Sequence, residues 1–114
     1  MSFSNIMSMF KPSAGAQGVT HDEMRAASVK GDAAIIDVRE PAEFASGRIP
    51  GSVNHPLSRF DVNKLPKDKP LIVVCLSGAR SATAARQVLA SGRTDVRHYA
   101  PGMMGWRRFG EKIV

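Results

Sequence analysis

Residues 71–90 read LIVVCLSGARSATAARQVLA and contain the only cysteine of the chain, Cys75. The apolar run 71–74 predicts a buried strand, and residues 81–90 have the composition of a helix. A short loop of small residues joins them, so we expect the thiol at the carboxyl end of a sheet, beside a helix N-terminus. Backbone N–H groups and the helix dipole form an anion site at such a place, and they favour thiolate over thiol.

The alternative is an inert cysteine, because a single thiol that closes an apolar strand is often a small buried hydrophobe. Three features of the loop favour reactivity instead. Gly78 allows the backbone to turn its N–H groups inward, Arg80 supplies a fixed positive charge, and Ser81 is a candidate helix cap. We therefore interpret Cys75 as the catalytic nucleophile. The candidate substrate-binding cradle consists of the backbone N–H groups of the loop, at Leu76, Ser77, Gly78, Ala79 and Arg80.

Strand and helix patterns alternate along the rest of the chain. The sequence Thr20-x-x-Glu23 is a capping box that predicts a helix from His21 to about residue 29. The remaining patterns predict strands over 33–38, 52–54, 71–74 and 96–99, and helices over 41–47, 81–90 and 103–109, with a loose helical segment over 57–62. This alternation predicts an α/β fold, a parallel sheet with helices on both faces.

Charged residues near the second strand have structural interpretations. Arg39 and Glu43 are four residues apart around a helix start, which favours an ion pair between them. Asp37 is expected to bind loop N–H groups. Phe44, in the short helix that begins at Pro41, is expected to face inward.

Five short motifs together resemble the rhodanese (thiosulfate sulfurtransferase-like) domain. They occur in the family's order and run from about Thr20 to Phe109: Asp37-Val38-Arg39, Glu43-Phe44, Gly47 to Gly51, Cys75 to Ser81, and Gly102 to Trp106. The resemblance implies the rhodanese-like α/β fold. It also implies a sulfurtransferase that moves sulfane sulfur from thiosulfate or a persulfide donor to a thiol or cyanide acceptor through a Cys75 persulfide, with no metal and no organic cofactor.

Loop length bears on the first alternative function. Cysteine phosphatases and arsenate reductases of the Cys-x5-Arg type place arginine six positions after cysteine, where this chain has Ser81. Arg80 comes one position earlier, and the shorter loop is better matched to one sulfur atom than to a tetrahedral phosphate. A second alternative is a non-catalytic rhodanese-like binding module, whose cysteine carries sulfur for a partner or does nothing.

Composition limits the function classes further. With 114 residues the chain supports one domain, and a single cysteine cannot form an internal disulfide, which fits a reducing, cytoplasmic location. The net charge of +6 comes from dispersed arginines without interleaved aromatic residues, so a nucleic-acid partner is not expected. No apolar stretch is long enough to cross a membrane. The histidines have no metal-ligand spacing, so a zinc site is not expected either.

The first residues differ from the rest of the chain. Phe3, Ile6, Met7 and Phe10 recur at helical spacing before a small-residue stretch. We predict a flexible or amphipathic arm over 1–17 that is dispensable for catalysis, followed by the rhodanese-like domain over 18–114. One cysteine provides no second thiol to resolve a persulfide, so the sulfur acceptor is expected to be an outside molecule, including a protein acceptor.

Overall fold

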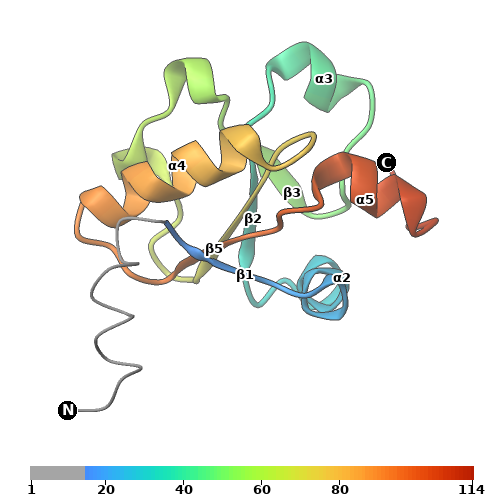
Figure 1. Ribbon diagram of the computed structural model, residues 1–114, viewed down its shortest axis with the longest axis horizontal. Coiled ribbons are helices and arrows are strands. Elements are labelled where there is room, and N and C mark those ends of the chain that lie inside the picture. The colour runs from blue at the N-terminus through green and yellow to red at the C-terminus, as the bar shows by residue number, and fades with distance from the viewer. Residues whose placement is uncertain (1–14) are drawn as a thin grey trace.

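The computed structural model describes residues 15–114, in which five parallel strands form one sheet (Figure 1). The strands are β1 (Gln17–Gly18), β2 (Ala34–Asp37), β3 (Ser52–Asn54), β4 (Leu71–Val74) and β5 (Val96–His98), in the order β1-β5-β4-β2-β3. The helices are α2 (His21–Lys30), α3 (Pro41–Ala45), α4 (Ala79–Ala90) and α5 (Gly102–Arg108), with 3-10 turns η2 (Leu57–Arg59) and η3 (Val62–Lys64). The predicted α/β class is confirmed.

Helices cover both faces of the sheet, and successive residues of one strand pack against opposite layers. Ile35 belongs to the apolar cluster that contains Met24 of α2 and Trp106 of α5. Ile36 belongs to the other cluster, which contains Val88 of α4. Figure 1 shows α2 and α4 on opposite sides of the sheet. Within the part of the chain that the structure describes, no helix is long and apolar enough to span a membrane.

The start of α2 follows the sequence signal, whereas the start of α4 does not. Thr20 caps α2 as predicted, with its hydroxyl accepting the Glu23 N–H at 3.1 Å. Helix α4 begins at Ala79, and its cap is Gly78 in the left-handed region, with φ of 105°. The prediction that Ser81 caps this helix is therefore wrong. Glycine reaches a positive φ that other residues rarely adopt, so the helix begins earlier and Ser81 is buried inside its first turn.

Two further local predictions are wrong or incomplete. Phe44 does not enter the core, because no residue of the five-residue helix α3 is buried, and its ring instead lies under the Arg48 guanidinium at 4.9 Å. Strand β1 has no sequence signal, since two exposed residues show no periodicity. It places Gln17, the last residue of the predicted arm, opposite Arg97 of β5. Residues 1–14 of that arm lie outside the described residues.

Candidate active site

Cys75 directly follows β4, which lies between β5 and β2 in the sheet. The residue is 1% exposed and packs within the apolar cluster on the α4 side. Its sulfur, however, contacts polar groups: the Gly78 N–H donates to Sγ at 3.0 Å, and Sγ lies 3.5 Å from the Ser81 hydroxyl. An inert core cysteine is surrounded by apolar groups, so these two polar contacts favour the reactive interpretation.

Helix α5 fixes the orientation of the Cys75 loop. The Met103 N–H donates to the Cys75 carbonyl at 2.9 Å, and the Met104 N–H donates to the Leu76 carbonyl at 3.0 Å. Both carbonyls are thereby bound to the first turn of α5, which holds the loop backbone in place. This close approach requires Gly102, because a Cβ at that position would lie 2.3 Å from the Leu76 carbonyl oxygen.

Two opposing effects set the pKa of the Cys75 thiol. Burial raises it, because desolvation disfavours the charged form. Hydrogen bonds from the Ser81 hydroxyl and from the N–H groups of Ser81, Gly78 and Ser77 lower it, and together they outweigh burial. The pKa of Cys75 therefore lies below its ordinary value. Gly78 and Ser77 belong to the predicted cradle, and substrate binding by Leu76, Ser77, Gly78, Ala79 and Arg80 stays a prediction.

Ser81 is a site residue that sequence reasoning missed. It is fully buried, and its hydroxyl donates to the Gly78 carbonyl at 3.1 Å besides contacting the sulfur. The sequence contains a signal for this role, because a residue six positions after Cys75 lies in the first turn of the helix that follows the loop. A serine at that position is equally typical of a helix cap. Because Ser81 was interpreted as a cap, its contact with the sulfur was not predicted.

The Arg80 side chain is paired with a carboxylate. Its two terminal nitrogens donate to the two oxygens of Glu43, at 2.7 and 3.0 Å. The ion pair is partly exposed, and the Arg80 hydrogen bond is the main cause that lowers the pKa of Glu43 to about 2. Glu43 thus offsets a cation that would otherwise oppose the dipole at the start of α4.

The predicted ion pair between Arg39 and Glu43 is wrong. Arg39 instead binds Asp37 in a buried, bidentate pair with a shortest distance of 2.7 Å, and it reaches Glu43 only through the backbone carbonyl. Its Nη2 group also donates to the Gly47 carbonyl, at 2.8 Å. Asp37 is fully buried beside Arg39, whereas the Glu43 carboxylate binds Arg80. Arg39 therefore ties the end of β2 to the segment around α3.

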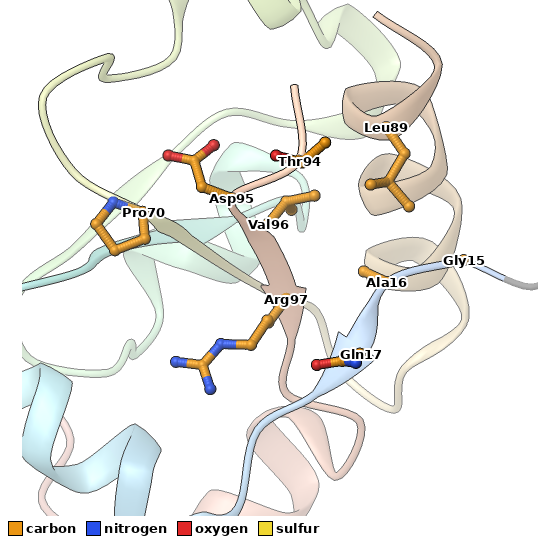
Figure 2. Close-up of a pocket in the computed structure, with 9 residues that line it drawn as sticks. All are labelled: Gly15, Ala16, Gln17, Pro70, Leu89, Thr94, Asp95, Val96 and Arg97. Atoms are coloured by element: carbon orange, nitrogen blue, oxygen red, sulfur yellow. The ribbon is translucent and has the colours of Figure 1, made fainter. Parts of the chain in front are cut away.

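One cavity lies away from the Cys75 loop. Its volume is about 500 Å³, and it is lined by residues around β1 and the start of β5, including Pro70, Asp95 and Arg97 (Figure 2). No residue of the loop 75–81 lines this cavity.

Across residues 15–114, no three His, Cys, Asp or Glu side chains gather where they could hold a metal ion.

Comparison with known proteins identifies the relatives of this chain. The model of the rhodanese-like domain family matches residues 20–109. A protein named sulfurtransferase from Allochromatium vinosum is 34% identical over 85 residues, which are 73% of this chain and 79% of that protein. The thiosulfate sulfurtransferase GlpE of Pseudomonas syringae is 40% identical over 78 residues, which are 66% of this chain and 73% of that protein. The structure of the human single-domain sulfurtransferase TSTD1 has a TM-score of 0.71 at 30% identity, covering 82% of this chain and 97% of that one.

Proposed function

The chain belongs to the rhodanese-like domain family, and from this premise we propose that it is a sulfurtransferase in which Cys75 carries sulfane sulfur as a persulfide. The observation that supports the proposal most directly is the set of donors around the sulfur. The Gly78 N–H lies 3.0 Å from Sγ, and the Ser81 hydroxyl lies 3.5 Å from it. These groups stabilise a thiolate, which is the nucleophilic form of cysteine.

The reaction proceeds in two displacement steps. The Cys75 thiolate attacks the outer sulfur of thiosulfate, a new S–S bond forms, and the donor's S–S bond breaks so that sulfite leaves with the electron pair. A thiolate or cyanide acceptor then attacks the outer sulfur of the persulfide, and Cys75 leaves as the thiolate. The loop N–H groups hold the negative charge in both steps. In each step one bond forms and one bond breaks, and the step needs no metal and no organic cofactor.

The acceptor in this proposal is an external molecule. Cys75 is the only cysteine of the sequence, so no second thiol of the same chain can resolve the persulfide. Thiosulfate or a persulfide is the donor, and a small thiol, cyanide or a protein thiol is the acceptor. A reducing cytoplasm, which keeps Cys75 available as a thiol, is the location we propose.

Phosphatase and arsenate reductase chemistry is the alternative that the loop disfavours. Ser81 occupies the place of the arginine in the Cys-x5-Arg pattern, and it is buried with its hydroxyl on the sulfur. The Arg80 guanidinium is bound by Glu43 at both terminal nitrogens. With an aryl phosphate as substrate, we expect no phosphate release that depends on Cys75.

Intact-mass spectrometry tests the proposed function. Thiosulfate should add one sulfur atom to the wild-type protein, and cyanide should then remove it. Cys75→Ser should never gain the sulfur, because a hydroxyl is far less ionised and cannot form a persulfide. A wild-type protein that gains no sulfur from thiosulfate or a persulfide donor would support the non-catalytic binding module instead, and a serine variant that gains it would exclude Cys75 as the carrier.

A further inference from the structure

The Ser81 hydroxyl connects the sulfur to a histidine. Its oxygen lies 3.5 Å from the Sγ of Cys75 and 3.3 Å from the Nδ1 of His98. His98 belongs to β5, the strand next to β4, which Cys75 follows. The third neighbour of the Ser81 hydroxyl is the Gly78 carbonyl at 3.1 Å. A hydroxyl has one proton to donate, so the proton that Ser81 directs toward one of these groups is not available to the others.

We propose that His98 is a positioning residue for the nucleophile that acts through a hydrogen-bond relay: its Nδ1–H donates to the Ser81 oxygen and turns the Ser81 O–H toward the Cys75 thiolate. When the thiol loses its proton to solvent, the Ser81 hydrogen bond moves from the Gly78 carbonyl to the sulfur. No covalent bond other than the S–H bond breaks. The inference rests on the proposed function only in that sulfur transfer needs the thiolate.

The fold holds His98 where this relay requires it. The residue is half-buried, its backbone pairs with Gly18 of β1 and Val73 of β4, and its carbonyl accepts the Val19 N–H at 3.0 Å. The side chain lies on the same face of the sheet as the first turn of α4, to which Ser81 belongs.

Burial and a neighbouring positive charge keep the His98 imidazole neutral. Burial lowers the pKa of His98, and the positive charge of Arg86 on α4 lowers it further. Its strand partners, Gly18 and Val73, carry no charge, so among the described residues Arg86 is the charged group that acts on the imidazole. A neutral imidazole carries one N–H, which in the Nδ1–H tautomer is the donor that the relay needs.

A double-mutant cycle on the thiolate tests the relay in the full chain. The ultraviolet absorbance of the thiolate is followed against pH, with Cys75→Ser subtracted as background. His98→Leu should raise the pKa of Cys75 and reduce the thiolate population at neutral pH by roughly two- to tenfold, the range of one net hydrogen bond. His98→Asn should restore part of the thiolate, because an amide N–H can donate to Ser81 in place of the imidazole N–H. In a Ser81→Ala background, His98→Leu should have no further effect.

The control is His55→Asn, since His55 is also a partly buried histidine whose pKa is lowered by burial. It should leave the thiolate titration unchanged. An unchanged titration in folded His98→Leu, no restoration by asparagine, or additive effects of the Ser81 and His98 changes would each overturn the relay. If the leucine variant does not fold, His98→Ala takes its place. No sulfur donor is added, so the outcome is independent of whether the protein transfers sulfur.

Discussion

At the scale of single residues, the negative charge of the site is stabilised by hydrogen bonds more than by a free cation. Arg80 is close to Cys75 in sequence, but its guanidinium is committed to Glu43. The groups that lower the pKa of Cys75 are the Ser81 hydroxyl and the loop N–H groups. Such fixed dipoles need no reorganisation when charge develops on the sulfur.

Arg80 is predicted to matter for the use of an anionic donor more than for the existence of the persulfide. Arg80→Ala should weaken kcat/KM for thiosulfate by about 1–3 kcal/mol, the loss of a charged hydrogen bond. The persulfide should still form at high donor concentration, as intact mass would show. Arg108→Ala removes the same charge from an exposed position and serves as the control. Equal losses in the two variants would mean that Arg80 acts only through net charge.

The ion pair with Glu43 predicts a pH dependence of stability. The pKa of Glu43 is lowered to about 2 from its ordinary value of 4.5, so its stabilisation is complete above 4.5 and is lost as the pH falls toward 2. Because both side chains are about one-third exposed, Glu43→Gln should cost only about 1 kcal/mol or less at neutral pH.

Urea unfolding of the wild type and Glu43→Gln at several pH values tests this dependence. The difference in free energy of unfolding should shrink as the pH is lowered through that window. If the difference in free energy of unfolding between the two proteins stays constant from neutral to acid pH, the charge of the Glu43 carboxylate does not stabilise the fold.

At the scale of elements, the site depends on the contact between α5 and the Cys75 loop. Gly102→Ala is predicted to disrupt it, since its φ is 65° and the new Cβ would lie 2.3 Å from the Leu76 oxygen and 2.7 Å from the Cys75 oxygen. Both contacts are with backbone, which cannot rotate away. We expect a loss of at least about 3 kcal/mol in unfolding free energy and a weakened thiolate.

Gly92→Ala is the matched control for this substitution. Gly92 also has a positive φ, of 97°, but nothing lies within 4 Å of the position that an added methyl group would take. The substitution should cost about 1–2 kcal/mol from backbone strain alone. Urea unfolding measures both costs, and the thiolate absorbance reports the site. Similar losses in the two variants would show that the close approach of α5 is not needed.

Much of the element order was predictable, because strong local signals mark it. The Thr20–Glu23 capping box, the apolar run 71–74 and the cysteine at its end all agree with the structure. Residue pairing was less predictable, since it depends on where the folded backbone directs each side chain. Arg39 pairs with Asp37, two positions away, rather than with Glu43, and His98 meets Ser81 although 17 positions separate them. The second contact depends on how α4 packs against β5.

At the scale of the whole molecule, the edge strand β1 lies beside β5, the strand that carries His98. It pairs only with β5 within the described residues, at Gln17 with Arg97 and at Gly18 with His98. The Val19 N–H adds a bond to the His98 carbonyl. The edge of the sheet and the histidine of the proposed relay are therefore supported by the same short segment.

Two truncations separate the predicted arm from this edge strand. Removing residues 1–14 should leave both sulfur transfer and the free energy of unfolding largely unchanged, because β1 and the loop 75–81 remain intact. Removing residues 1–18 deletes β1 and leaves the backbone of β5 without its edge partner, so unfolding should require less urea, and the pKa of Cys75 should rise as His98 loses its fixed position. Intact mass after thiosulfate, urea unfolding and thiolate absorbance measure the three quantities in both proteins. A folded protein lacking residues 1–14 that no longer takes up sulfur would show that the arm completes the site, and identical behaviour of the two truncations would show that β1 does not support it.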